Sequence, residues 1–115
     1  MKLPKHGKAI ISQSKVVSYL LSDSHRDGRS KAAFFRKYGS STESWEELAE
    51  TLRHHVADNE VRKIEDSPFG TRYVVEGELS APNGKMLSIR SVWFMATSES
   101  IPWFVTAYPL KRKQR

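Results

Sequence analysis

The feature that most constrains the fold is the Pro82-Asn83-Gly84 tripeptide between two long segments, Thr71–Leu79 and Lys85–Ala96. Both segments are rich in β-branched and aromatic residues, which favours strands. Asn-Gly supplies the positive backbone φ that a tight type I′ hairpin turn needs. The two segments therefore predict antiparallel strands joined by a hairpin. Gly77, inside the first segment, predicts a β-bulge there.

Two further strands are expected around this hairpin. Val61–Glu65 is a short candidate, and the turn residues Ser67-Pro68-Phe69-Gly70 separate it from the next strand. Trp103–Leu110 is expected to be the last strand, after a connection over residues 97–102. The second half of the chain therefore predicts an antiparallel sheet of four strands.

The first half reads as helical. Ser44-Trp45-Glu46-Glu47 matches the capping box that starts many helices. Shorter helices are expected over Lys15–Leu21 and from about Asp27 or Gly28 to Tyr38. In the helix that begins at this capping box, apolar residues recur at helical spacing, at Trp45, Leu48, Ala49, Leu52 and Val56.

These elements predict an α+β fold in which about three N-terminal helices pack on one face of a four-stranded, mostly antiparallel sheet. The 115 residues fit one domain. Within it, residues 1–12 are expected to be a lead-in and 111–115 a disordered basic tail. The chain has no cysteine, which excludes disulfides and thiol catalysis. It has no apolar run long enough to span a membrane and no signal-peptide segment, so export would need a longer protein that carries it.

The charge is positive and unevenly distributed. The chain carries a formal net charge of +6. Residues 1–42 hold nine Lys and Arg against two acids, residues 43–66 hold three against eight, and residues 67–115 hold seven against three. A basic body with one acidic helix suggests a polyanionic partner, although Lys and Arg also simply keep small domains soluble.

Polar side chains inside the expected strands are candidates for chemistry. Arg90 is the lone charge in a long apolar run, and strict alternation places Thr106 and Tyr108 on one face of the last strand together with Phe104. The structural alternatives are that Arg90 pairs with Glu76 or Glu78 and that Thr106 reflects ordinary β propensity. Exposed aromatic residues could stack on bases or, more often, fill the core: Phe69, Tyr73 and Trp103.

The helical half offers His25 and Lys31 at the mouth of a short expected helix. Lysine is disfavoured in a first helical turn because the helix dipole is positive there, so its presence suggests a function. Histidine can act as an acid or a base near neutral pH. A histidine, cations and hydroxyls together suit RNA cleavage by the adjacent 2′-hydroxyl, which needs proton transfer and stabilisation of phosphoryl charge.

Metal and nucleotide cofactors are not expected. His54 and His55 are adjacent, so they point about 100° apart on a helix and cannot both bind one ion. The six glycines are scattered singly and match neither phosphate-binding fingerprint. We therefore predict neither a metal nor a cofactor.

The sequence resembles a bacterial domain family of unknown function that occurs as stand-alone proteins and as C-terminal modules of polymorphic toxins. The likeness extends from about Leu3 to Leu110. It is carried by Tyr19-Leu20-Leu21, His25, Gly28-Arg29, Lys31-Ala32, Phe34-Phe35, Gly70-Thr71, Tyr73-Val74-Val75, Gly77, Leu79, Pro82-Asn83-Gly84, Arg90, Val92-Trp93 and Val105-Thr106-Ala107-Tyr108-Pro109. More distantly, the chain is similar to the barnase–EndoU–colicin–RelE superfamily of metal-independent ribonucleases.

The resemblance implies a toxin-type endoribonuclease acting in the cytoplasm on RNA, tRNA included, with a small acidic antitoxin or immunity protein as partner. His25 would be the base or acid, Lys31 and Arg90 would stabilise the transition state, and Thr106 or Tyr108 would hold the phosphate. RNA contacts are expected from Arg29, Arg72 and Tyr73. The alternative is a non-catalytic nucleic-acid-binding or protein-interaction module. An immunity protein fits less well, because such proteins tend to be acidic.

Overall fold

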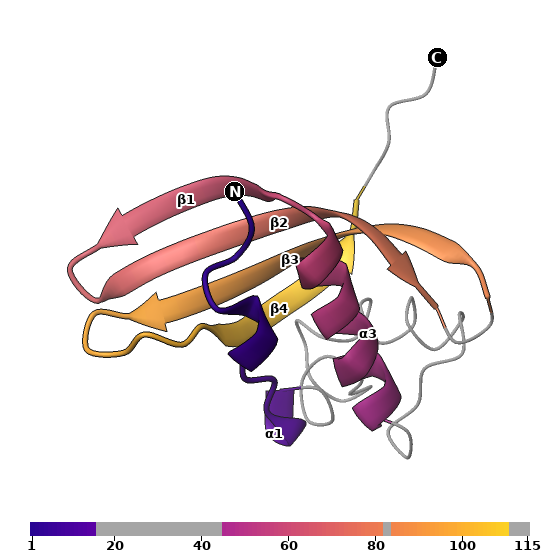
Figure 1. The fold of residues 1–115 in the computed structure, drawn as a ribbon, viewed down its shortest axis with the longest axis horizontal. Helices are drawn as coiled ribbons and strands as arrows, with labels where there is room; N and C mark the ends of the chain where they lie inside the picture. The colour runs from indigo at the N-terminus through magenta and orange to yellow at the C-terminus, as the bar shows by residue number, and fades with distance from the viewer. Residues whose placement is uncertain (16–44, 82–83, 111–115) are drawn as a thin grey trace.

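A computed structural model describes residues 1–15, 45–81 and 84–110 (Figure 1). Four strands form one sheet in the order β1-β2-β3-β4, and every neighbouring pair is antiparallel. One long helix, α3, lies against this sheet. The elements are η1 (His6–Lys8), α1 (Gln13–Lys15), α3 (Trp45–Asp58), β1 (Val61–Ser67), β2 (Gly70–Ser80), β3 (Met86–Ala96) and β4 (Trp103–Pro109).

The α+β class and the four-stranded antiparallel sheet are therefore confirmed. The expectation of about three helices is not supported, because the described residues contain a single long one. The segment expected as a helix from about residue 27 to Tyr38, and most of Lys15–Leu21, lie outside the described residues. Within the described part of the chain, no helix is long and apolar enough to cross a membrane.

The core lies between α3 and the sheet. Leu48, Leu52 and Val56 of the helix are buried, as the helical spacing predicted. They join a cluster that includes Ile89 and Trp93 of β3. The Trp93 ring meets the ring of Phe104 on β4 edge to face, with centroids 5.4 Å apart and planes at 68°. This packing fixes one face of the sheet as the core face.

His55 is a buried member of the same helix face and was not expected in the core. Its Nδ1 lies 3.2 Å from the backbone oxygen of Glu78, and its Nε2 lies 2.9 Å from the hydroxyl of Ser91. The indole N–H of Trp93 donates to the same hydroxyl at 2.9 Å. A polar network therefore ties the helix to β2 and β3 within the apolar core.

The β2–β3 hairpin forms where the Asn-Gly pair predicted it, but with a longer loop. The amide of Gly84 donates to the carbonyl of Ala81 at 2.9 Å, and the amide of Ala81 donates to that of Lys85 at 2.8 Å. Gly84 has φ 86°, a value that favours glycine. This hydrogen-bond pattern belongs to a three-residue loop rather than to the expected two-residue type I′ turn.

The predicted bulge at Gly77 is wrong. Gly77 opposes Ile89 in an unbroken β2–β3 register. The register shifts instead within Val61–Lys63 on β1 and beside Val92–Trp93 of β3. Gly77 is needed for a different reason, since a Cβ atom there would collide with the side-chain amide of Asn59.

The first residues, expected as a lead-in, contribute side chains to the core. Leu3, Ala9 and Ile11 are buried in the core. At one end of this segment, the backbone oxygen of Met1 accepts a bond from Val61 on β1 at 2.7 Å. At the other end, Ile10 pairs with β4 through a parallel bridge, with bonds of 3.0 and 2.8 Å. We call residues 1–11 the N-terminal segment.

Candidate functional site

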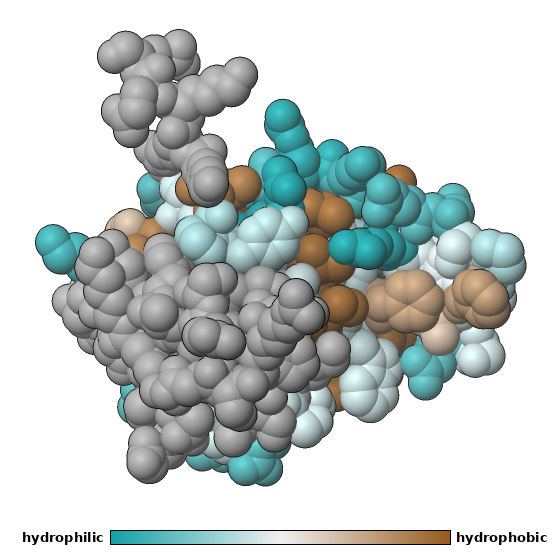
Figure 2. Space-filling model, turned by 180° about the vertical axis from the view of Figure 1, so that it is seen from behind, coloured by the Kyte–Doolittle hydropathy of each residue, from teal (hydrophilic) through white to brown (hydrophobic). Residues whose placement is uncertain are grey.

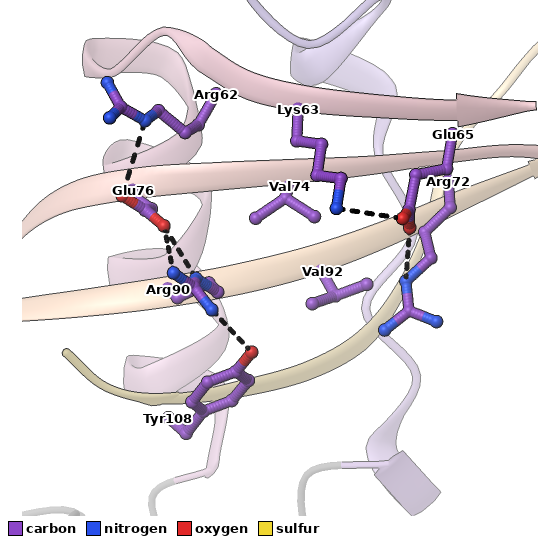
Figure 3. A pocket seen from close by; sticks show the side chains of 9 residues that line it. All are labelled: Arg62, Lys63, Glu65, Arg72, Val74, Glu76, Arg90, Val92 and Tyr108. Atoms are coloured by element: carbon purple, nitrogen blue, oxygen red, sulfur yellow. Dashed lines mark hydrogen bonds and ion pairs between the residues drawn. The ribbon is translucent and has the colours of Figure 1, made fainter.

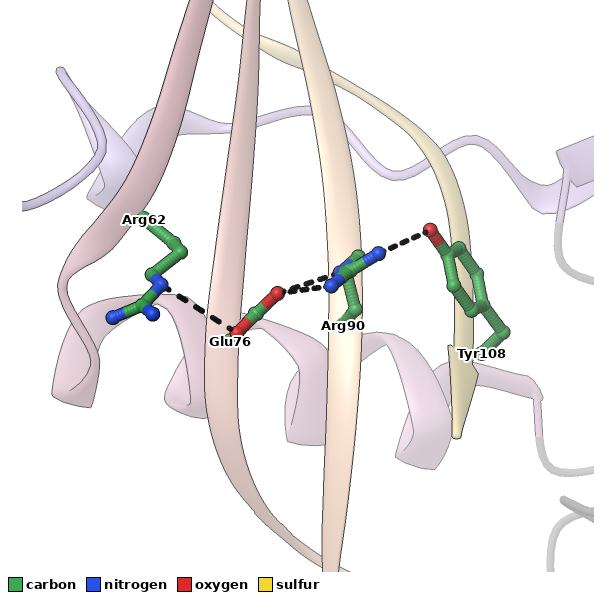
Figure 4. Close-up of polar contacts among 4 residues, drawn as sticks. All are labelled: Arg62, Glu76, Arg90 and Tyr108. Carbon is green, nitrogen blue, oxygen red and sulfur yellow. Dashed lines mark hydrogen bonds and ion pairs between the residues drawn. The ribbon is translucent and has the colours of Figure 1, made fainter. Parts of the chain in front are cut away.

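The sheet face opposite α3, here called the outer face, carries an ionic row across three strands. Glu76 of β2 lies opposite Arg90 of β3, and Arg90 lies opposite Tyr108 of β4. Side chains directly opposite one another in antiparallel strands share a face. The register therefore brings the three polar groups side by side (Figure 4).

Arg90 makes close contacts on both sides of this row. Its Nε donates to Glu76 Oε2 at 2.7 Å, and its Nη2 lies 2.5 Å from the same oxygen. Its Nη1 donates to the hydroxyl of Tyr108 at 3.4 Å, and its guanidinium carbon lies 5.8 Å from that ring's centre. The bonds to Tyr108 and Glu76 raise the pKa of Arg90 above its ordinary value, so this group stays a cation. The register and contacts thus hold the guanidinium in a fixed position.

A hollow of about 430 Å³ surrounds this row on the outer face (Figure 3). Its apolar floor is Val74 and Val92, with ionic groups around it. Seen from behind, the molecule shows hydrophilic teal side chains bordering brown hydrophobic ones (Figure 2). The hollow is lined by Arg62, Lys63, Glu65, Arg72, Val74, Glu76, Arg90, Val92 and Tyr108.

Positive charge exceeds negative charge in the hollow, with four cations against two carboxylates. Glu65 lies 3.2 Å from the ammonium of Lys63 and 3.7 Å from Nε of Arg72. Glu76 also lies 3.9 Å from Nε of Arg62. Three of these cations are mostly exposed, so their side chains can move from the carboxylates to an arriving anion.

The structure brings some of the sequence-predicted site residues together. Arg90 and Tyr108 are in contact, and Arg72 lines the same hollow. Thr106 lies opposite Val92 on the outer face, one pleat along β4 from Tyr108, and does not line the hollow. The expected alternative partner of Arg90 is also confirmed, because Glu76 pairs with it.

Tyr73 does not belong to this surface. It opposes Trp93 on the core face, and its half-buried ring packs against the hydrophobic core. Its neighbour Arg72 points to the other face because successive strand residues alternate. Arg72 and Tyr73, both expected to contact RNA, therefore lie on opposite faces of the sheet.

Strict alternation along β4 is also wrong. Val92 opposes Thr106 while Trp93 opposes Phe104, which leaves Val105 as an extra residue in the strand. This bulge puts Phe104 in the core and leaves Thr106 on the outer face. Phe104 and Thr106 therefore do not share a face.

Three expected site residues, His25, Lys31 and Arg29, lie outside the described residues. Glu76 is a member of the hollow that sequence reasoning treated only as a structural partner of Arg90. Its signal was available, since a glutamate on the same face of a neighbouring strand as a lone arginine puts a carboxylate at the same place. Among residues 1–15, 45–81 and 84–110, no three His, Asp or Glu side chains gather as metal ligands.

Comparisons with known proteins place the fold. One chain of a contact-dependent growth inhibition toxin–immunity protein complex from Klebsiella pneumoniae 342 is similar, with a TM-score of 0.68 and 17% identity. The similarity covers 88% of this chain and 99% of that chain. No curated protein matches the sequence. At this identity, the likeness shows a shared fold.

A family model described as a domain of unknown function, DUF6883, matches residues 2–111. This agrees with the expected membership of a family of unknown function. The relation to the metal-independent ribonucleases stays a prediction. Since the match spans nearly the whole sequence, this chain belongs to the DUF6883 family.

Proposed function

We propose that this domain is a toxin-type endoribonuclease that cleaves RNA through attack of the 2′-hydroxyl and needs no metal ion. The observation that carries the proposal is the Glu76–Arg90–Tyr108 row inside a cationic hollow. It combines a carboxylate, a fixed guanidinium and a phenol within reach of one phosphate. The fold likeness to a chain of a toxin–immunity protein complex supports the same direction.

The chemistry assigns a role to each group in the row. Glu76 takes the proton of the 2′-hydroxyl, whose oxygen then bonds to phosphorus. The bond from phosphorus to the 5′-oxygen breaks, and that oxygen receives a proton. Arg90 faces the charge that builds on the phosphoryl oxygens, and the Tyr108 hydroxyl donates to one of them. The products are a 2′,3′-cyclic phosphate and a 5′-hydroxyl.

The second proton transfer is assigned to His25, with Lys31 as a further cation. Both residues stay proposals from the sequence. The cationic hollow, with Arg72 at its β2 side, would hold the flanking phosphates. A basic surface of this kind also suits an acidic immunity protein that covers the hollow and blocks RNA.

The test incubates the purified domain with total tRNA and with a synthetic RNA, both in EDTA. We expect cleavage by the wild type and losses of at least about a hundredfold for Arg90→Lys and Glu76→Gln. Arg53→Lys, on the far side of the molecule, is the matched control because its ion pair with Glu50 is exposed. Tyr108→Phe and His25→Ala test the remaining roles.

The substrate provides a second control. An oligonucleotide with 2′-deoxy sugars at every position lacks the nucleophile and should stay intact, while the RNA yields a cyclic phosphate end. The proposal fails if the wild type leaves RNA intact in EDTA, or if Arg90→Lys and Glu76→Gln cleave as fast as the wild type.

One observation favours the non-catalytic alternative. Two nitrogens of Arg90 lie against one oxygen of Glu76, so much of its charge is neutralised in the free protein. A pair held this way can serve binding or stability without catalysis. In that case the RNA stays intact in the cleavage assay, while a gel-shift measurement detects its binding to the domain.

A further inference from the structure

Two aromatic side chains lie on the outer face, at the end of the sheet beyond Arg72. Phe94 near the end of β3 lies directly opposite Trp103 at the start of β4. Phe94 also lies opposite Arg72, which lines the hollow. We call Phe94 and Trp103 the aromatic ledge. In Figure 2, hydrophobic side chains reach the end of the sheet where the turn between β1 and β2 lies.

The aromatic ledge is held in place and partly exposed. Trp103 exposes 41% of its surface, whereas the tryptophan of β3, Trp93, is fully buried. The ring of Phe94 lies so close to Gly70 that an added Cβ would sit 2.6 Å from it. The backbone at Trp103 is fixed by its bridge to Ile10. Trp103 thus offers a partly exposed indole on the same face of the sheet as Arg72, which suits a flat ligand with negative charge.

We propose that the aromatic ledge stacks on an unpaired nucleobase of the RNA whose phosphates lie in the hollow. The inference rests on the proposed function for RNA binding in the hollow, and it names the substrate class as single-stranded RNA. Phe94 lies four residues along β3 from Arg90, which is about 13 Å at the rise of a strand. The stacked base therefore belongs to a nucleotide next to the one that reacts.

Stacking and charge together explain why an unpaired strand is required. A duplex keeps its bases stacked on each other, so the ledge cannot reach a base face. A single strand can turn one base onto the indole while its phosphates meet Arg72 and Lys63. Stacking accepts any base, so weak sequence preference is expected.

The experiment measures binding rather than cleavage. The probe is a short single-stranded oligoribonucleotide with 2′-O-methyl groups, which removes the attacking hydroxyl. We expect Trp103→Ala to weaken its binding about tenfold or more and Trp103→Phe to keep most of the affinity. The same strand made with abasic sites should bind the wild type and Trp103→Ala equally. Met86→Ala, at the other end of β3 with 57% of its surface exposed, is the matched control.

Tryptophan fluorescence gives a readout that a structural role would not move. The single-stranded probe should quench emission of the wild type, and Trp103→Phe should lose that quenching while keeping the melting temperature. The ledge is overturned if Trp103→Ala binds the probe like the wild type, as it would if the ledge served a protein partner. It is also overturned if the wild type binds no oligonucleotide. If the wild type binds RNA without cleaving it, the proposed catalysis is contradicted, whereas the stacking role of the aromatic ledge is not.

Discussion

The buried hydrogen bonds among His55, Ser91 and Trp93 fix which ring nitrogen of His55 carries the proton. The carbonyl of Glu78 can only accept, so His55 Nδ1 carries a proton and donates to it. The neutral imidazole then accepts at Nε2 from the hydroxyl of Ser91, whose oxygen accepts from Trp93. Every polar atom in this chain of bonds has a partner of the right kind.

Removing the hydroxyl should be costly although the volume lost is small. Ser91→Ala leaves His55 Nε2 and the Trp93 indole N–H buried without partners. We expect the free energy of unfolding to fall by about 1–3 kcal/mol, measured by urea denaturation. Ser80→Ala, at an exposed position on β2, should change it little. Equal stability of the two variants would contradict this network.

The same network makes stability depend on pH. Burial lowers the pKa of His55 below its ordinary 6.5, although the carbonyls of Glu78 and Val75 and the charge of Asp58 oppose this. Below pH 6.5 the unfolded chain takes up a proton that the folded protein still refuses. The free energy of unfolding should therefore fall as pH drops through 6.5, and level off below the folded pKa.

Urea unfolding from about pH 8 to about pH 5 checks this sign. His55→Gln should remove this part of the pH dependence. His54→Gln should keep it, because the His54 side chain is exposed. A profile that rises toward acid pH in the wild type, or one that His55→Gln leaves unchanged, would count against the assignment.

Single residues were predictable where the pattern is local. The lone charge in the apolar run of β3 marked Arg90, and the alternation of β2 offered Glu76 as its partner. His55 was missed although it lies three residues after Leu52 on the buried helix face. A histidine among polar neighbours looks solvent-exposed until the opposing strand supplies Ser91 and a carbonyl.

At the scale of the elements, the junction of α3 and β2 requires a residue without a side chain at Gly77. Asn59 follows the helix, and its amide donates to the carbonyls of His55 at 2.8 Å and Glu78 at 3.3 Å. The amide fits against Gly77, where a Cβ would collide with it. Glycine is therefore required here for close approach, not for a strand irregularity.

Gly77→Ala should displace the Asn59 amide and lower the melting temperature by several degrees. Asn59→Ala removes the colliding amide, but it also removes the two hydrogen bonds that this amide donates. In that background, Gly77→Ala should cost much less than in the wild type, which thermal unfolding of the double-mutant cycle measures. Gly7→Ala is the matched control, because nothing lies within 4 Å of a Cβ there. Additive costs at positions 59 and 77 would refute the collision.

The strands themselves were predictable from composition and turn residues. Which side chains of each strand face the core was only partly predictable. The extra residue at Val105 exchanges the faces of Trp103 and Phe104 relative to strict alternation along β4. Nothing in the local sequence signals it, because the shift follows from packing Phe104 against Trp93 across the sheet. Errors of this kind move a candidate site residue from one face to the other.

At the scale of the whole molecule, positive charge exceeds negative charge on the outer face among the described residues. The hollow collects four cations on the outer face, while the acidic residues Glu46, Glu47 and Glu50 lie on α3, on the opposite side of the sheet. An anionic ligand is therefore attracted to the outer face and repelled from the α3 side of the sheet. The acidic helix was visible in the sequence, but Arg62 and Lys63 lie within the acidic residues 43–66, and only the strand register places them on the outer face.

The salt dependence of RNA binding measures how many phosphates this surface meets. A plot of log affinity against log salt should fall, with a slope near −0.7 for each phosphate neutralised on a single strand. Arg62→Gln and Arg72→Gln should each make the slope shallower by about that amount. Arg53→Gln on α3 should leave it unchanged. A slope that neither hollow variant alters would place the RNA elsewhere.

The N-terminal segment ties the two sides of the sheet together. It bonds to β1 at Met1 and to β4 at Ile10, on strands that lie about 14 Å apart at normal strand spacing. It thus connects the two edge strands of the curved sheet. Its length limits how far the sheet can flatten, and with that how wide the hollow above can spread. The width of a hollow that accepts one nucleic acid strand would then depend on the N-terminal segment, whose residues do not contact the ligand.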